Sequence, residues 1–293
     1  TYKAHVSLAR GTVTGTRFGI AAQNSGGIVL ESGTVRGDVG VCTSFYGGTI
    51  TLGAEGTDGP TVYGQTCGIA TNYDTTAYSG TIHCPEGIGI RLGGHYSGQN
   101  ESAGAGLYLE GTPTIDAATD IYLDYDKTLV KSRYIQVNVA LTDGTYSVDC
   151  QMDYDVIAKP GTGITLQRTW FTSANANKFV QHIAQGKLSL GPCAHGDKKA
   201  VQNEDGVTHD VFCNICQTTP EKDVPCSGGT ATCKNKAVCT ACGEQYGELG
   251  DHIIDPATGY CSGGCGTRLA VAMIEKNSTA SYSADLAAAF AAV

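Results

Sequence analysis

The chain has 293 residues, of which 41% are hydrophobic and 40 are glycine, and its formal net charge at pH 7 is −9. This length accommodates two or three domains, and the apolar fraction is too high for a disordered chain. The negative charge and the lack of Lys/Arg clusters exclude nucleic-acid binding through phosphate neutralisation. No apolar run reaches the roughly 18 residues of a membrane-spanning helix, so we expect no membrane insertion. The chain starts with Thr1 rather than Met, which indicates a piece of a longer protein.

Short apolar phrases recur through the first 135 residues, after a predicted strand within Thr1–Arg10. Thr12-Val13, Thr34-Val35 and Thr61-Val62 begin 22 and 27 residues apart, and Thr114-Ile115 follows 53 residues later, which suggests two coils of about 26. Such periods are typical of solenoids, whose repeats bury their apolar faces against one another. Short segments rich in Thr, Val and Ile, broken by Gly, predict a β-solenoid with three strands per coil and glycine at the corners.

Aligning these phrases predicts which side chains stack from coil to coil. Ala21 aligns with Cys42 and Ala70, and Leu30 aligns with Leu52 and Cys84. We expect these ladders to point inward, which makes Cys42 and Cys84 small hydrophobic residues in a buried stack. A disulfide between Cys67 and Cys84 remains an alternative that spacing does not decide.

Several acidic residues of the first half are candidates for polysaccharide-cleaving chemistry, which uses grouped carboxylates or calcium on one outer face. These residues are Asp74, Asp116, Asp120, Asp124, Asp126, Asp153 and Asp155. We expect no Lys or Arg at a matching place in the adjacent coils. His83 and His95 also lack a neighbouring ligand set. Solvated turns are therefore favoured over an active site, and no catalytic residue is assigned.

The pattern loosens between Ala140 and Leu190, where we predict a β-rich cap or linker. The predicted strands lie within Gly144–Cys150, Gly163–Leu166, Asn177–Val180 and Lys187–Leu190, with Trp170 and Phe171 packed beneath them. At the end of the chain, Leu269–Glu275 predicts a strand and the Ala-rich Tyr282–Val293 predicts a helix.

The last third of the chain carries the most specific chemical signal, because nine of the 13 cysteines fall between Cys193 and Cys265. Three pairs have the spacing of metal-binding knuckles, in which one tight turn supplies two ligands: Cys213-x2-Cys216, Cys239-x2-Cys242 and Cys261-x3-Cys265. Further candidate ligands lie nearby: Cys193, His195, His209, Cys226, Cys233 and His252. The segment is too polar to form a core unaided, so zinc or disulfides must stabilise it.

Zinc is the favoured alternative, because histidine has no role in a disulfide framework and 13 cysteines leave one thiol unpaired. Oxidising extracellular surroundings favour disulfides instead. One hypothetical site draws on five candidates for four places: Cys193, His195, His209, Cys213 and Cys216. A second uses Cys226, Cys233, Cys239 and Cys242. A third combines His252, Cys261 and Cys265 with a ligand borrowed from the first.

Three resemblances follow from these residues. Residues 10–135 resemble the right-handed parallel β-helix of the pectate-lyase-like type. Thr119–Leu123 with Lys127–Val130 is similar to the closing coil of large surface proteins of Gram-positive bacteria, and Ile135–Val139 fits the strand that follows. Cys226–His252 is similar to the "GGTATC…KAVCxxCGxxYGEL…H" module of long secreted, cell-wall-associated repeat proteins of Firmicutes. In such proteins a passage like the C-terminal one opens the next β-helix, although a C-terminal helix docked on the zinc module is the alternative.

These inferences predict an all-β chain. It comprises a parallel β-helix over residues 1–135, a β-rich cap over 136–190, a zinc-ribbon-like module over 191–268, and a strand and helix over 269–293. The resemblances imply a non-enzymatic structural or adhesive segment of an extracellular surface protein, part of a longer tandem array. A glycan or a host surface protein is the expected partner, contacted by exposed tyrosines: Tyr46, Tyr63, Tyr73, Tyr78 and Tyr96. The alternative is a carbohydrate-active β-helix enzyme, a lyase or glycoside hydrolase, with an accessory module.

Overall fold

The computed structural model describes residues 5–23, 26–43, 48–93, 105–124, 133–153 and 155–292. The chain divides into two compact units, Thr1–Ala194 and His195–Val293. Among the described residues, no helix combines the length and apolar character needed to cross a membrane. Several residues singled out from the sequence lie outside the described ranges: Tyr46, His95, Tyr96, Asp126 and Lys127–Val130.

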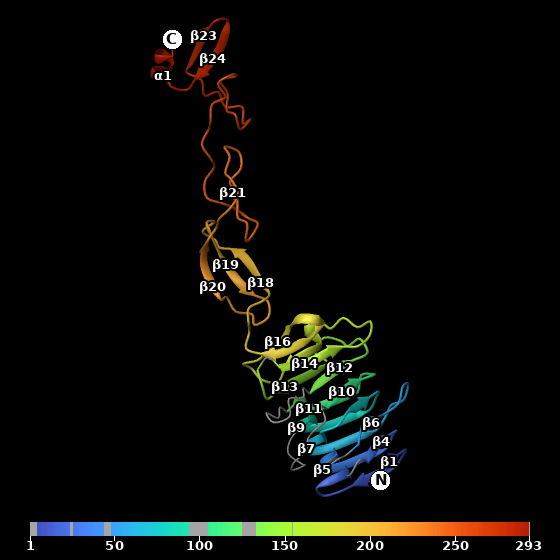
Figure 1. The fold of residues 1–293 in the computed structure, drawn as a ribbon. Coiled ribbons are helices and arrows are strands. Elements are labelled where there is room, and N and C mark those ends of the chain that lie inside the picture. The colour runs from blue at the N-terminus through green and yellow to red at the C-terminus, as the bar shows by residue number, and fades with distance from the viewer. Residues whose placement is uncertain are drawn as a thin grey trace. The chain divides into compact units, whose positions relative to one another are not determined.

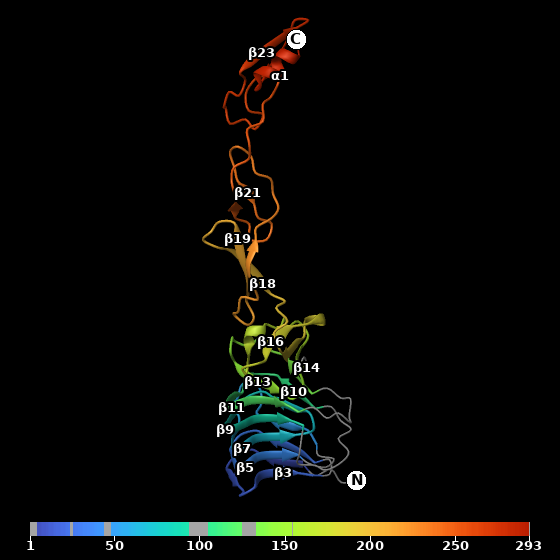
Figure 2. The ribbon, with the colours of Figure 1, turned by 90° about the vertical axis from the view of Figure 1, so that its left-hand side faces the viewer.

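The first unit is a parallel β-solenoid of about six coils, which confirms the predicted fold class (Figures 1 and 2). One wall is a nine-stranded sheet, in the order β1 (His5–Leu8), β4 (Gly27–Leu30), β6 (Ile50–Leu52), β8 (Thr75–Ala77), β10 (Gly106–Leu109), β12 (Tyr134–Val137), β14 (Asp155–Pro160), β17 (Leu188–Gly191) and β16 (Phe179–His182). The other is an eight-stranded sheet of β15 (Phe171–Ser173), β13 (Tyr146–Cys150), β11 (Thr114–Leu123), β9 (Thr81–Leu92), β7 (Thr61–Thr71), β5 (Thr34–Thr43), β2 (Thr12–Thr14) and β3 (Phe18–Ala22).

The eight-stranded sheet is bent, and this explains the three strands expected per coil. In the first coil β2 and β3 are separate, yet both pair with the single long strand β5. The pairing of β5 with β7 shifts register between Gly37 and Val39, which marks the bend between two limbs. Each coil therefore contributes one straight strand to the nine-stranded sheet and two strand segments, the limbs, to the bent sheet. In the longer strands the two limbs form one continuous strand.

The predicted stacking of the Thr-Val phrases is confirmed. Val13 pairs with Val35, Val35 with Val62, Val62 with Ile82, and Ile82 with Ile115. Val35, Val62 and Ile82 have no exposed surface. Burying a side chain of this kind contributes roughly 1.5–3 kcal/mol, so the repeated ladder is the main source of stability in this unit.

The predicted alignment is wrong in the fourth coil. Leu30 stacks on Leu52 as expected, but the next residue in the row is Ala77 and not Cys84. Strand β8 was missed because Thr75-Thr76-Ala77 lacks the apolar character of the other phrases. Thr81 instead pairs with Thr61, so the expected coils of about 26 residues are in fact coils of 20 and 33.

Cys42, Cys67, Cys84 and Cys150 are buried free thiols of the solenoid, but not all of them face the main core. Ala21, Cys42 and Ala70 are in register, as expected. Cys42 and Cys84 are buried, as expected, and Cys42 and Ala70 pack with Val39 and Cys67 in a small cluster separate from the main core. Burial raises the pKa of Cys42 to about 11 and that of Cys67 to about 12. Cys67 and Cys84 carry free thiols, and no disulfide joins them.

The parallel stacking continues beyond residue 135, further than the sequence suggested. Strand β13 pairs with β11, β14 with β12, and β15 with β13, all in parallel. Antiparallel β17 and β16 then close the nine-stranded sheet, which ends the coil repeat. The strand predicted at Gly163–Leu166 is absent, and this segment precedes the short 3-10 helix η1 (Arg168–Trp170). A second one, η2 (Ala184–Gly186), links β16 to β17.

The second unit consists of small antiparallel sheets and one short helix. Its elements are β18 (Lys198–Gln202), β19 (Thr208–Cys213), β20 (Glu221–Pro225), β21 (Ala237–Val238), β22 (Gln245–Tyr246), β23 (Ala272–Lys276), β24 (Thr279–Ser283) and α1 (Leu286–Ala291). Strand β19 is central in the three-stranded sheet β18-β19-β20. The helix predicted at Tyr282–Val293 is shorter than expected, because Asp285 caps its start with its side chain and residues before it form β24.

A row of four glycines sets the distance between the limbs of the bent sheet. Gly19, Gly40, Gly68 and Gly89 stand at equivalent positions in β3, β5, β7 and β9. A Cβ at Gly40 would lie 2.5 Å from Cγ1 of Val62, and one at Gly68 would collide with Cγ2 of Ile82. These glycines are needed for close packing against the Val/Ile ladder and not for a left-handed backbone, since none has a positive φ.

We predict that Gly68→Ala destabilises the first unit by about 1–3 kcal/mol, the usual cost of overpacking a tight core. The added methyl group has backbone on its other side, 2.6 Å from the Gly89 carbonyl oxygen, so it cannot move away. Trp170 is the only tryptophan and is buried in this unit, so its fluorescence during urea unfolding reports on the solenoid. Gln65→Ala, at an exposed position of the same strand, is the control and should stay within about 0.5 kcal/mol of wild type. Equal urea midpoints for Gly68→Ala and wild type would contradict the packing argument.

Candidate metal centres

Twelve cysteine and histidine side chains of the chain form three groups of four that could each hold a metal ion. The first group is Cys193, His195, Cys213 and Cys216, the central group is His209, Cys226, Cys239 and Cys242, and the third group is Cys233, His252, Cys261 and Cys265. Within each group the ligand atoms lie within 4.8 Å of one another. Among the described residues, no other set of three or more His, Cys, Asp or Glu comes together in this way.

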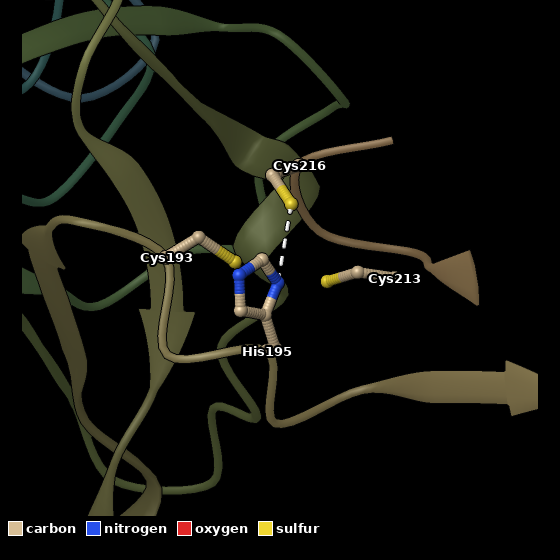
Figure 3. A group of neighbouring side chains, drawn as sticks. All are labelled: Cys193, His195, Cys213 and Cys216. Carbon is tan, nitrogen blue, oxygen red and sulfur yellow. Dashed lines mark hydrogen bonds between the residues drawn. The ribbon is translucent and has the colours of Figure 1, made fainter. Parts of the chain in front are cut away.

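In the first group a histidine faces three thiols (Figure 3). Cys193 and His195 lie just before β18, and Cys213 ends β19. The Sγ atom of Cys216 lies 3.4 Å from Nδ1 of His195. The hydroxyl of Thr218 lies 3.0 Å from the same sulfur and can donate a hydrogen bond to its thiolate.

The central and third groups repeat this arrangement. Nδ1 of His209 lies 3.6 Å from Sγ of Cys226 and 3.8 Å from Sγ of Cys239. In the third group Nδ1 of His252 lies 3.5 Å from Sγ of Cys261 and 3.3 Å from Sγ of Cys265. In all three groups, therefore, the same ring nitrogen approaches the thiols.

These separations match tetrahedral coordination better than disulfide bonding. With metal–ligand bonds of roughly 2.0–2.3 Å, neighbouring ligands of a tetrahedral zinc ion lie about 3.5–3.8 Å apart. The Sγ atoms of Cys233 and Cys261 are 3.4 Å apart, far longer than the about 2.05 Å of a disulfide. No disulfide joins any of the 13 cysteines, all of which lie in the described ranges. Each group also holds three cysteines, an odd number that pairwise oxidation leaves incomplete.

The three knuckles share a local backbone structure. The carbonyl oxygen of Cys213 accepts a hydrogen bond from the amide of Gln217 at 3.0 Å, and that of Cys239 accepts one from Gly243 at 2.9 Å. In the third knuckle the Cys261 carbonyl accepts from Gly264 at 3.0 Å. The residue after the second cysteine has a left-handed backbone in each case, with φ of 59° at Gln217, 78° at Gly243 and 79° at Gly266. The turn therefore directs both thiols of a pair to the same side.

Backbone amides in these turns also favour the thiolate form of the first cysteine. The amide of Cys242 is the main cause that lowers the pKa of Cys239 to about 6. Its neighbour Cys226 shows the opposite effect: burial, followed by hydrogen bonding to Cys239, raises its pKa to about 12. A cation at the centre would favour the thiolate form of both, because metal binding displaces thiol protons.

The ligand groups take the place of a hydrophobic core in the second unit. The buried cysteines here, Cys213, Cys226, Cys239 and Cys261, all belong to the groups, and His209 is 4% exposed. The only other buried hydrophobic residues described in this unit are Ala237 and Ala289. Each group offers four protein ligands, which would fill the coordination shell of a tetrahedral ion, as is typical of structural metal sites.

The sequence identified all twelve residues of these groups, but it grouped them wrongly in two places. His209, proposed as a candidate for the first group, belongs to the central group. Cys233, assigned to the second site, belongs to the third group, so the third site takes its fourth ligand from the second set and not from the first. Sequence spacing alone suggests that ligands close together in the chain share one site. His209 and Cys213 are close in the chain, but β19 places them at opposite ends of one strand, so they belong to different groups.

The acidic residues of the solenoid are dispersed among local contacts. Asp116 pairs with His83 at 2.6 Å. Asp74 accepts a hydrogen bond from the Gly106 amide, and Asp120 accepts one from the Ser147 amide. Asp153 lies 3.4 Å from Nζ of Lys178, and Asp155 accepts from the amide of Val156. Nζ of Lys178 also lies 3.6 Å from the carboxylate of Asp149, so this lysine joins the Asp149 and Asp153 carboxylates.

One expectation about these acids was wrong. Arg91 stands in the coil next to Asp124, where no basic residue was expected, and donates to its carboxylate at 2.7 Å. In the strand register Arg91 lies opposite Tyr122 and not opposite Asp124, which is two residues further along the chain. Aligning the coils by sequence therefore does not show the contact between Arg91 and Asp124.

Comparisons of the chain with protein-family models, with curated proteins and with solved structures give no match.

We predict that removing metal unfolds the second unit and leaves the first intact, because only the first has an apolar core. Limited proteolysis with and without a strong chelator measures this: chelation should open cleavage sites throughout residues 195–292. Trp170 emission should not change, because that residue packs in the solenoid core. A second unit that resists protease equally in chelator would contradict the assignment of the groups as its structural basis.

Proposed function

We propose that the protein is a non-enzymatic structural and adhesive segment of a bacterial extracellular surface protein, with zinc ions holding its second unit together. The observation that carries the proposal is the closed four-ligand composition of all three Cys/His groups. Stability is what such closed four-ligand sites provide.

Zinc is the metal that fits the donor set best. Each group supplies three soft thiolates and one imidazole, in a spacing that suits a tetrahedral ion. Calcium and magnesium prefer six or more oxygen ligands, and the groups contain no carboxylate.

The chemistry of the remaining thiols is compatible with an oxidising environment. Cys42, Cys67, Cys84 and Cys150 are at most 3% exposed. Burial raises the pKa of Cys150 to about 11, as it does for Cys42, so the reactive thiolate form is scarce. The similarity of Cys226–His252 to secreted cell-wall modules supports the same location.

The outer surface of the solenoid supports an adhesive role. Arg36, Tyr63, His83 and Asp116 stand in register on adjacent strands. The guanidinium of Arg36 lies 3.7 Å from the centroid of the Tyr63 ring. A groove of about 590 Å³ lies along Arg36 and Tyr63. Its other lining residues are Thr14, Gly15, Thr16, Gly37, Asp38, Gly64 and Gln65. Such hydrogen-bonding groups suit the hydroxyls of a glycan, which we propose as the ligand.

The metal part of the proposal predicts three zinc ions per chain after purification in the presence of zinc. Native mass spectrometry and elemental analysis measure this number directly. A variant with Cys242→Ser should lose zinc, whereas Cys42→Ser in the solenoid should retain all three ions. Protein without zinc but with mapped Cys–Cys links would contradict the assignment.

The adhesive part predicts glycan binding without turnover. Arrays of bacterial and host glycans should give ligands whose binding falls about tenfold in Arg36→Ala, because a hydrogen bond to a charged group contributes roughly 1.5–3 kcal/mol. Lys222→Ala in β20, which also removes one exposed cation, is the control and should bind normally. Release of reducing or unsaturated sugar from a bound glycan would favour the carbohydrate-active enzyme.

A further inference from the structure

The ligands of the three Cys/His groups interleave along the chain. The first group spans residues 193–216, the central group 209–242 and the third group 233–265. His209 of the central group therefore precedes Cys213 of the first, and Cys233 of the third precedes Cys239 of the central group. No group is complete before the next one begins.

The first shared segment is strand β19. It carries His209 near one end and Cys213 at the other, which for extended chain is a separation of roughly 13 Å. Hydrogen bonding on both sides holds this strand, since His209 pairs with Gln202 in β18 and with Val224 in β20. A metal ion that fixes His209 therefore restricts where Cys213 lies.

The second shared segment runs from Cys233 to Cys239. A turn begins it, in which the Thr232 hydroxyl accepts a hydrogen bond from the Asn235 amide at 3.0 Å. Strand β21 follows and pairs with β22, directly before Cys239. The central knuckle is thus joined to Cys233 by a short, hydrogen-bonded piece of chain.

Burial separates the central group from the other two. His209, Cys226 and Cys239 are 4%, 8% and 1% exposed. In the third group His252 is exposed, and in the first group only Cys213 is buried. An ion in the central group would be the best shielded of the three.

From the interleaving and this burial we propose that the three groups bind zinc cooperatively and that the central group controls the other two. Filling the central group orders β19 and the Cys233–Cys239 segment, which presents Cys213 to the first group and Cys233 to the third. The outer groups then bind without the entropic cost of ordering these segments themselves. This inference rests on the proposed function, because it requires that the groups bind zinc.

Three matched variants test the coupling: Cys216→Ser, Cys242→Ser and Cys265→Ser. Each removes the last cysteine of one group, and none lies in a shared segment. Zinc affinity is measured by competition with a chromophoric chelator. Cys242→Ser should weaken both outer groups by about 5- to 150-fold, the usual range for coupled sites. Cys216→Ser should leave the third group unchanged, and Cys265→Ser should leave the first unchanged. If each variant loses one ion and binds the other two with wild-type affinity, the coupling is refuted.

A measurement on the unmodified protein covers the case in which Cys242→Ser fails to fold. Native mass spectrometry at substoichiometric zinc should show mainly chains with no zinc and chains with three. A statistical distribution of zero, one, two and three ions would overturn the coupling while leaving zinc binding intact. A wild-type protein that takes up no zinc at any concentration would instead overturn the proposed function.

Discussion

Burial of side chains away from water stabilises each unit of this protein, but the two units bury different kinds of side chain. In the solenoid, similar residues stack on one another from coil to coil, and Val35, Val62 and Ile82 are buried in this repeated stack. The glycine row at Gly40 and Gly68 lets the limbs approach closely enough for this packing. In the second unit, cysteine and histidine side chains occupy the buried positions instead. A bound cation is the natural partner for such a set, because buried polar groups must be satisfied.

This difference accounts for what could be predicted from the sequence. The solenoid was predictable because its Thr-Val phrases repeat the same buried pattern, and short-range spacing is enough to align them. The alignment failed where Thr75-Thr76-Ala77 fills a coil position with weakly apolar residues, so that Cys84 was assigned to the place of Ala77. The contact between Arg91 and Asp124 was also missed, since Arg91 lies opposite Tyr122 in the strand register and reaches Asp124 two residues further on.

The candidate metal ligands were predictable as a set for a chemical reason. Cysteine pairs at knuckle spacing with nearby histidines are specific, because few other structures need them. Their grouping was not predictable, since it depends on which ligands β19 and the Cys233–Cys239 segment carry to which group. Sequence spacing identifies the residues that can act as ligands, but only the folded backbone determines which group each ligand joins.

The odd number of thiols in each group has a consequence for ageing of the protein. Metal loss in the presence of dissolved oxygen allows two of three cysteines, such as Cys233 and Cys261, to couple, and the remaining Cys265 then has no partner in its own group. That residual sulfur can form a covalent link to a second molecule. Storage without metal would therefore produce covalently cross-linked oligomers, which reductant could reverse.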